Sequence, residues 1–514
     1  MNGAESLVRT LVGCGVGTCF ANPGTSEMHF VAALDRVEGM RAILGLFEGA
    51  VTGMADGYGR MAEAPAATLL HLGPGLANGL ANLHNARRAA TPIVNIVGDH
   101  ATYHGQYDPP LASDIEGFAR PVSGWIQSSP SSRDVASDAA RAVQAARQPP
   151  GQIATLILPA DTAWMDAERP APPLPHPAPV PVADLAVSQA AQALTSGRNT
   201  LLLIRGPALK EQGLRAAAQV AAKTGARVAC DTFPPRWQRG AGRPLIEQIP
   251  YFAEQILDFM KGVEQLILVG ASPPVSFFAY PGQPSWCTPG NCRILHLAHP
   301  HEDGVSALQA LADAVGATRE RAGLAPFQPP GPPSGRLDAI TAAQVIGRLL
   351  PEQAIVSNEA NTAGAGLGKA TACAAPHDHL ALTGGSIGQG IPVATGAAVA
   401  CPDRKVVCLQ GDGGALYTVQ ALWTQARENL DVTTVIFANH SYAILNIELM
   451  RVGVEHAGPT ALSMLDLHNP TIDWLSLSAG LGVEASRAHT VGEFSDQFAR
   501  AMREPGPRLI EVAL

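Results

Sequence analysis

The sequence is poor in charged and aromatic residues, which make up 15% and 5% of its 514 positions. Its net charge is −9 and no basic stripe is present, so we expect no nucleic-acid partner. No uninterrupted apolar run reaches about 18 residues, so we expect no membrane span. The N-terminus lacks a basic segment followed by an apolar run, and no signal peptide is predicted.

The cysteines also follow no functional pattern. The eight of them form no CxxC pair and no Cys/His cluster at zinc-binding spacing. Scattered thiols are typical of a reducing compartment, which predicts a cytoplasmic protein. By contrast, 46% of the residues are hydrophobic, which indicates well-buried sheets and large subunit contacts.

Two proline-rich stretches divide the chain. Residues 169–181 read RPAPPLPHPAPVP and residues 326–333 read PFQPPGPP, and such segments favour extended, semi-rigid connections. They leave three blocks of ordinary domain size. We therefore predict domains at residues 1–168, 183–325 and 336–514.

Strand and helix patterns alternate in all three blocks, which predicts an α/β fold with three parallel-sheet domains. In the first block we expect helices at 3–13, 48–61 and 77–89, and strands at 17–21, 43–46, 67–72 and 92–98. In the second we expect strands at 201–204, 227–229, 266–269 and 294–297. In the third we expect strands at 353–356, 406–409, 432–438 and 507–512, with a helix at 392–399.

Residues 409–446, LQGDGGALYTVQALWTQARENLDVTTVIFANHSYAILN, read as strand, glycine turn, amphipathic helix and strand. Asp412 and Asn439 then lie at carboxyl ends of parallel strands, where ligands bind in open α/β sheets. With a loop carbonyl near Ser441, their oxygens suit Mg²⁺ shared with phosphates. The glycines at 411, 413 and 414 let the backbone approach a diphosphate. The alternative is an ordinary Gly-Asp-Gly turn without a ligand.

Three positions in the first block carry polar groups next to apolar strands. Thr25 or Ser26 could simply cap the helix that follows NPGTSE. Glu48 could simply favour the dipole of the helix that it begins. His71 lies in the apolar run 68–72, where a histidine is commonly a hydrogen-bonded core residue. Each also has the chemistry of a catalytic group.

The spacing Gly411-Asp412-Gly413, 25 residues, then Asn439 resembles the diphosphate–Mg²⁺ motif of thiamine diphosphate (ThDP) enzymes. That motif usually ends in two asparagines, and Ala438 replaces the first. NPGTSE, FEGAVTGMADGYGR, LLHLGPG and TPIVNIVGD follow the order found in the pyrimidine-binding domain of ThDP-dependent 2-oxo acid decarboxylases and acetolactate synthase-like enzymes. Benzoylformate decarboxylase has the most similar pattern.

The resemblance implies pyrimidine- and diphosphate-binding domains flanking a Rossmann-like middle domain. FAD is not expected, because GASPPVSFFAYPG at 270–282 lacks the stretch typical of FAD-containing acetolactate synthases. The histidine that benzoylformate decarboxylases carry here is also missing, and Phe277, Phe278 or Tyr280 would fill its space. The resemblance also implies a homodimer or homotetramer with active sites between subunits.

The resemblance assigns roles to individual residues. Glu48 would hydrogen-bond the pyrimidine ring of ThDP, His71 would relay protons, and Thr25 would bind the substrate carboxylate. The Gly385 carbonyl would accept from the aminopyrimidine, and Ile387 would support the bent cofactor. Other cofactor contacts would come from Asn361, Thr362, Gly411, Asp412, Gly413, Gly414, Asn439, Ser441, Tyr442 and Ala443, with Mg²⁺ on Asp412, Asn439 and Ser441. Leu445 and Glu448 would line the substrate pocket, although Glu448 could be a solvated surface residue.

These expectations predict a ThDP- and Mg²⁺-dependent enzyme that decarboxylates a 2-oxo acid, or joins it to a second carbonyl compound. Three alternatives stay open. They are a catalytically silent subunit with the same fold, a ThDP lyase for a donor such as a 2-hydroxyacyl-CoA or diketone, and an enzyme using another nucleotide.

Overall fold

Six parallel strands form the first sheet of the computed structural model, which describes residues 1–454 and 456–514. The strand order is β2-β1-β3-β4-β6-β5. Every position of β3 and β6 is buried, as expected for parallel strands covered by helices on both faces. The strands are β1 (Thr18–Asn22), β2 (Arg41–Leu44), β3 (Ala66–Leu70), β4 (Ile93–Asp99), β5 (Trp125–Ser128) and β6 (Ile153–Pro159), and the main helices are α1 (Gly3–Gly13), α3 (Glu48–Ala62), α4 (Leu72–Ala89) and α6 (Val135–Ala146).

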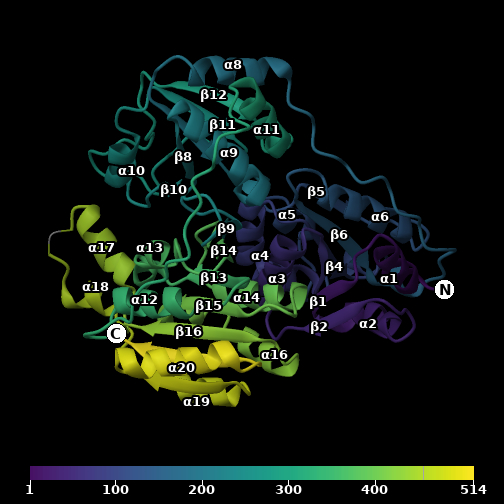
Figure 1. Ribbon diagram of the computed structural model, residues 1–514. Helices are drawn as coiled ribbons and strands as arrows, with labels where there is room; N and C mark the ends of the chain where they lie inside the picture. Colours follow the sequence, from purple (N-terminus) through teal and green to yellow (C-terminus); the bar gives the residue numbers. More distant parts are fainter. Residues whose placement is uncertain (455) are drawn as a thin grey trace.

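The second sheet is parallel and smaller, with the order β10-β8-β7-β11-β12. It lies at the top of the view in Figure 1, with α8 and α11 beside it. Its strands are β7 (Thr200–Ile204), β8 (Arg227–Cys230), β10 (Glu247–Gln248), β11 (Gln265–Val269) and β12 (Arg293–Ala298), and its helices are α8 (Asp184–Leu194), α9 (Glu211–Thr224), α10 (Ala253–Met260) and α11 (Gly304–Ala314).

The third sheet has seven strands in the order β17-β18-β16-β15-β13-β14-β9. All its pairs are parallel except β9 (Trp237–Arg239), which runs antiparallel to β14. Strand β9 comes from the middle of the chain, so one short strand crosses from the second predicted block into the third sheet. The other strands are β13 (Ala354–Glu359), β14 (His377–Ala381), β15 (Val406–Gly411), β16 (Val432–Ala438), β17 (Glu484–Ala488) and β18 (Arg508–Ala513). The domain boundaries stay a prediction.

Helices α3 and α14 (Gly390–Ala400) join the first block to the third, and they lie side by side at the centre of Figure 1. A Cβ at Gly57 would overlap the carbonyl of Val393, and one at Gly396 would overlap the carbonyl of Met54. One buried apolar cluster contains residues of both helices. Glycine at the crossing therefore lets the two helix backbones touch.

The predicted elements are largely confirmed, with three corrections. Strand β3 ends at Leu70, so His71 lies outside the strand, and α4 begins at Leu72 rather than at residue 77. The predicted glycine turn itself forms the short helix α15 (Asp412–Ala415), and the helix expected after it is helical only over α16 (Ala421–Arg427). Between them Leu416 is 40% exposed and the Thr418 hydroxyl donates to Gly388, so tertiary contacts overrode the amphipathic pattern.

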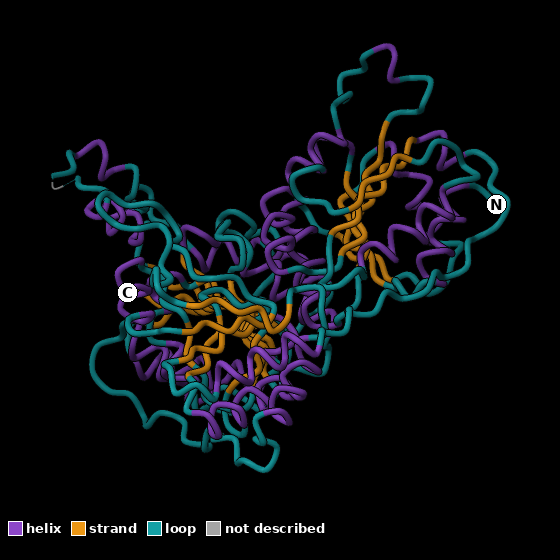
Figure 2. Tube along the Cα trace, turned by 90° about the horizontal axis from the view of Figure 1, so that it is seen from above, coloured by secondary structure: helices purple, strands orange, loops and turns teal. Residues whose placement is uncertain are grey.

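Viewed from above in Figure 2, the strands lie in the interior and the helices and loops surround them. None of the helices in the described part of the chain is both long and apolar enough to cross a membrane. All eight cysteines lie within the described residues and are free thiols.

Candidate active site

Asp412 and Asn439 meet at the carboxyl edge of the third sheet. Strands β15 and β16 are parallel neighbours with Gly411 opposite Phe437, so the two residues follow adjacent strand ends, as predicted. Asp412 is 2% exposed. Its Oδ2 accepts from the backbone N–H of His440 at 2.7 Å and its Oδ1 from that of Gly413 at 2.9 Å. The Asn439 Oδ1 accepts from the backbone N–H of Ser441 at 3.1 Å.

These oxygens fit a hard cation. Burial raises the pKa of the Asp412 carboxyl, and the hydrogen bonds from His440 and Gly413 oppose that rise. No cationic side chain among the described residues makes an ion pair with Asp412. In the same part of the chain no group of three His, Cys, Asp or Glu side chains could hold a metal. One carboxylate, one amide oxygen and a backbone carbonyl instead suit Mg²⁺ that takes its other ligands from phosphates and water.

The glycine turn brings other predicted cofactor residues together. A Cβ at Gly413 would overlap the ring of Tyr442, the residue that precedes α17 (Ala443–Arg451). A Cβ at Gly414 would lie 3.7 Å from the Cβ of Ile387, and one at Gly411 would lie 3.8 Å from Nδ2 of Asn361. Thr362 follows Asn361 in the short helix η4 (Asn361–Gly364). The turn is thus surrounded by residues predicted to contact one cofactor.

Glu359, which the sequence analysis gave no role, holds the backbone at residues 388–390 and also lies beside the glycine turn, where a Cβ at Gly414 would stand 2.7 Å from its Oε1. It is 2% exposed at the end of β13 and accepts three backbone N–H groups, from Gly388 at 2.7 Å, Gln389 at 2.7 Å and Gly390 at 2.6 Å. Burial raises the pKa of its carboxyl, and these hydrogen bonds oppose the rise. Its place at the end of an apolar strand, two residues before Asn361, was the available signal.

An aromatic side chain of the middle block packs against the glycine loop, residues 384–388. A Cβ at Gly385 would lie 2.6 Å from Cζ of Phe277, and the Phe277 and Phe278 rings are 4.8 Å apart. Phe277 thus packs against Gly385, and its filling the space of the histidine found in benzoylformate decarboxylases stays a prediction. The backbone of Gly385 has φ +75°, a conformation that favours glycine.

Glu48 begins α3 and is 7% exposed. Its Oε2 accepts from Nδ2 of Asn78 at 3.0 Å. A Cβ at Gly75 would lie 3.1 Å from Oε1 of Glu48 and 3.4 Å from Cβ of His71. Glu48 and His71, predicted as catalytic residues, therefore both lie next to Gly75.

His71 lies at the N-cap of α4 and pairs with a carboxylate that the sequence analysis missed. Its Nδ1 is 2.8 Å from Oε2 of Glu27 and 3.5 Å from Oγ of Ser26. The Glu27 side chain is fully buried and accepts from the backbone N–H of Gly24 at 2.8 Å. A Cβ at Gly98 would overlap its Oε1. The available signal was the glutamate that ends NPGTSE, together with Gly98 in β4.

The predicted cap at Thr25 or Ser26 is wrong. Gly24 is the N-cap of the short helix η1 (Thr25–Glu27), because Glu27 reaches back to its backbone N–H. Thr25 is exposed, which leaves its hydroxyl free to meet a ligand.

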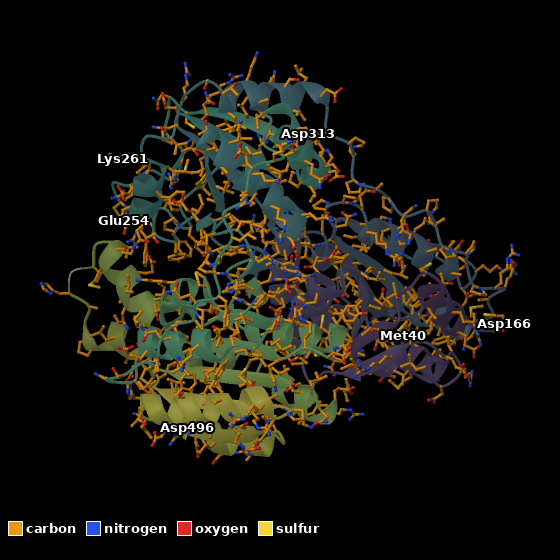
Figure 3. The ribbon with its side chains drawn as sticks, viewed as in Figure 1. Met40, Asp166, Glu254, Lys261, Asp313 and Asp496 are labelled. Atoms are coloured by element: carbon orange, nitrogen blue, oxygen red, sulfur yellow. The ribbon has the colours of Figure 1, made fainter. Side chains whose placement is uncertain are left out.

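Helix α17 carries the two predicted substrate-pocket residues. Leu445 is 42% exposed. Glu448 accepts from the Tyr280 hydroxyl at 3.1 Å, and its side chain is 15% exposed, so its reading as a solvated surface residue is wrong. Arg451 binds Glu254 of α10 through two nitrogens, at 2.5 and 2.7 Å. Figure 1 shows α17 beside α10, and Figure 3 labels Glu254 on the side of the middle block that faces α17.

Comparison with known proteins matches both ends of the chain to one family. Residues 1–118 match the N-terminal, and residues 366–512 the C-terminal, TPP binding domain of thiamine pyrophosphate enzymes. The chain is 54% identical to the Mycobacterium tuberculosis protein named "Putative acetolactate synthase large subunit IlvX", over 100% of this chain and 99% of that one. It is 29% identical to benzoylformate decarboxylase of Pseudomonas aeruginosa, over 97% and 96%.

Comparison of the fold with solved structures identifies the same family. The solved structure of the ThDP-dependent 4-hydroxybenzoylformate decarboxylase of Rhodococcus jostii superimposes with a TM-score of 0.87 at 25% identity, covering 100% of this chain and 99% of that one. The chain belongs to the thiamine pyrophosphate enzyme family. Within it, the chain is of the acetolactate synthase and benzoylformate decarboxylase type.

Proposed function

We propose that this protein is a ThDP- and Mg²⁺-dependent enzyme that acts on a 2-oxo acid. The observation that carries the proposal is the buried Asp412 carboxylate beside Asn439 at the ends of β15 and β16. Without a cation it has only backbone N–H partners, and the adjoining glycine turn would let the backbone approach a diphosphate. Mg²⁺ would be held by Asp412, Asn439 and the Ser441 carbonyl.

When bound, ThDP supplies a carbon nucleophile for the keto carbon and stores the electron pair that carbon dioxide leaves behind. The Glu48 carboxylate would exchange a proton with the pyrimidine ring nitrogen from its buried position at the start of α3. The Gly385 carbonyl and Ile387 would orient the cofactor, with Phe277 packed over Gly385. Tyr442 and Ala443 would close the diphosphate side.

His71 and Thr25 would handle the substrate. With Nδ1–H donating to Glu27, the His71 Nε2 is the atom left to exchange protons with the reacting acid. The exposed Thr25 hydroxyl would hydrogen-bond the substrate carboxylate. Leu445 would form an apolar wall of the substrate pocket. Glu448 would influence that wall only indirectly, through its hydrogen bond with Tyr280.

Two points of this proposal stay open between named options. The protein either releases an aldehyde after decarboxylation or passes the acyl unit to a second carbonyl compound. Its relatives include proteins named for each type of reaction. We further propose a cytoplasmic homodimer or homotetramer with active sites between subunits.

A silent subunit is the second candidate, and Glu48, Asp412 and Asn439 weigh against it because it would need none of them. A ThDP lyase for a 2-hydroxyacyl-CoA or diketone is the third. The experiment is carbon dioxide release with ThDP and Mg²⁺ from pyruvate, a branched 2-oxo acid and benzoylformate in parallel, with product identification. An aldehyde or a hydroxy ketone supports the proposal and decides its form. Bound ThDP without release from any acid contradicts it and favours the other two candidates.

A further inference from the structure

Helix α4 carries three asparagines on one face, Asn78, Asn82 and Asn85, at positions i, i+4 and i+7. Asn82 and Asn85 are 3% and 0% exposed. We propose that this asparagine row (Asn78, Asn82 and Asn85) positions the glycine loop, residues 384–388, and ties it to the start of α3 in the same chain. The inference rests on the function proposed above, in which Gly385 and Ile387 of this loop contact the cofactor.

Asn85 holds the centre of the glycine loop. Its Nδ2 donates to the carbonyl of Ser386 at 2.8 Å, and its Oδ1 accepts from the backbone N–H of Ser386 at 3.2 Å. One side-chain amide thus satisfies both backbone groups of one residue, as a neighbouring β-strand would. Because Ser386 stands between Gly385 and Ile387, this pairing fixes the peptide planes on either side of it.

Asn82 joins the loop to the start of α3. Its Nδ2 donates to the carbonyl of Gly49 at 2.8 Å and to that of Gly388 at 3.2 Å, and its Oδ1 accepts from Asn85 at 3.0 Å. One buried amide therefore links the residue after Glu48 with the residue after Ile387. Asn78 extends the row with its 3.0 Å bond to the Glu48 carboxylate.

The glycine loop needs such support because residues 382–389, all described, adopt neither helix nor strand. Glu359 holds the backbone from Gly388 to Gly390 from within the third block. The asparagine row supplies the bonds to Ser386 from the first block, about 300 positions earlier in the chain. A Cβ at Gly384 would overlap Asn85, so the helix and the loop are in direct contact.

These asparagines are positioning residues, since they hold backbone and carboxylate groups and not reacting atoms. A buried carbonyl that loses its donor favours a different backbone conformation. Loosening Ser386 would then move the Gly385 carbonyl and Ile387 together. The expected result is a looser glycine loop and weaker cofactor binding.

The test compares Asn85→Asp and Asn82→Ala with the control Asn95→Ala. Asn85→Asp keeps the shape of the side chain but cannot donate to Ser386. Asn95 is equally buried, bonds Thr68 and Thr155 within the first sheet, and has no bond to the glycine loop. Amide hydrogen exchange of residues 383–390 is measured in the unliganded protein, and ThDP affinity is measured with Mg²⁺.

Both row variants should exchange about tenfold faster in this segment and bind ThDP about tenfold more weakly, the effect of roughly one hydrogen bond. Asn95→Ala should change neither. Unchanged exchange in Asn85→Asp, or equal loosening in Asn95→Ala, would overturn the proposal, as would faster exchange with unchanged ThDP affinity. If Asn82→Ala does not fold, Asn85→Asp decides alone. If the unaltered protein binds no ThDP, the proposed function fails, while loop exchange still decides whether the row positions the loop.

Discussion

The Nδ1 atom of His71 lies 2.8 Å from Oε2 of Glu27, a carboxylate whose side chain is completely buried. The pair connects the N-cap of α4, which follows β3, to the turn that follows β1. One hydrogen bond therefore joins the segments that leave two neighbouring strands of the first sheet. It gives His71 a fixed orientation and directs Nε2 away from Glu27. The same carboxylate also holds Gly24, so the turn and the imidazole are fixed together.

The first prediction concerns this pair. Glu27→Gln removes the charged acceptor that orients His71, and kcat should fall roughly 100-fold, the lower end of a general acid–base contribution. ThDP affinity should stay unchanged, because Glu27 lies in the part of the site proposed to meet the substrate. Ser26→Ala is the comparison variant. Its hydroxyl donates to Oε1 of Glu27 at 2.9 Å and lies 3.5 Å from the same nitrogen, but its loss keeps the charged acceptor, so kcat should fall much less. An unchanged kcat in Glu27→Gln would contradict the claim that Glu27 orients His71 for proton transfer.

The second prediction concerns the crossing of α3 and α14. Gly396→Ala places a methyl group onto the carbonyl of Met54, and overpacking of this kind costs about 1–3 kcal/mol. Gly368→Ala is the control, because Gly368 is also helical but has open space at its Cβ position. It should be neutral or slightly stabilising. Thermal unfolding measures both, and equal melting temperatures would contradict the close helix contact.

The third prediction concerns acid stability. His377 and His379 lie in β14 with 4% and 6% exposure. Burial, with Arg239 nearby, lowers the pKa of His377 to about 4 and lowers the pKa of His379 well below its usual value. The unfolded chain therefore binds protons from about pH 6.5 downward while the folded chain does not.

Stability should consequently fall as the pH drops from about 6.5 toward 4, at up to about 1.4 kcal/mol per pH unit for each histidine. The double variant His377→Gln/His379→Gln should lose less stability than the unaltered protein between pH 7.5 and pH 5. Denaturant unfolding at the two pH values measures this difference. Parallel losses in both proteins would show that other groups cause the acid sensitivity.

The fourth prediction concerns the contact between α10 and α17. The two hydrogen bonds from Arg451 lower the pKa of Glu254 to about 2, but the Glu254 side chain is 50% exposed. A double-mutant cycle of Arg451→Ala and Glu254→Ala should therefore give a coupling of at most about 1 kcal/mol. The Arg451 guanidinium also lies 4.4 Å from the centre of the Tyr280 ring, so its loss should loosen Glu448 as well.

Arg451→Ala should accordingly raise hydrogen exchange in residues 443–451 and raise the KM for the 2-oxo acid more than it lowers kcat. Arg215→Ala on α9 is the control, because Arg215 pairs with Glu211 on its own helix. If α17 exchanges at the same rate in both variants, the contact with α10 does not hold the helix.

The sequence predicted most of the fold because its strands are short apolar runs bounded by glycine and proline. Strand β16 and helix α1 have the predicted bounds, and Asp412 and Asn439 lie at adjacent strand ends. The pattern could not show that His71 lies between a strand and a helix. The apolar run continues through Leu70 and Leu72 with no glycine or proline to mark the end of the strand. It also could not show β9, three residues that join a sheet built more than 100 positions later.

The site was predicted where the chemistry is local and missed where it depends on long-range contacts. Asp412 and the glycines stand together in the sequence. Glu27 acquires its role only when folding brings it to His71, and Glu359 only when residues 388–390 fold over it. The asparagines of α4 look like ordinary helix-surface residues until the third block packs against them. Leu416 shows the reverse case, an apolar residue at helical spacing that tertiary contacts leave exposed.

The most direct measurement is calorimetric titration of the protein with ThDP, once with Mg²⁺ and once with the metal chelated, in the unaltered protein and in Asp412→Asn. The account predicts saturable binding with Mg²⁺, loss of that binding without the metal, and at least about 100-fold weaker binding in Asp412→Asn, because the variant removes the only charged side chain among the proposed protein ligands of the cation. Equal ThDP affinity with and without Mg²⁺, or no binding to the unaltered protein, would contradict the account.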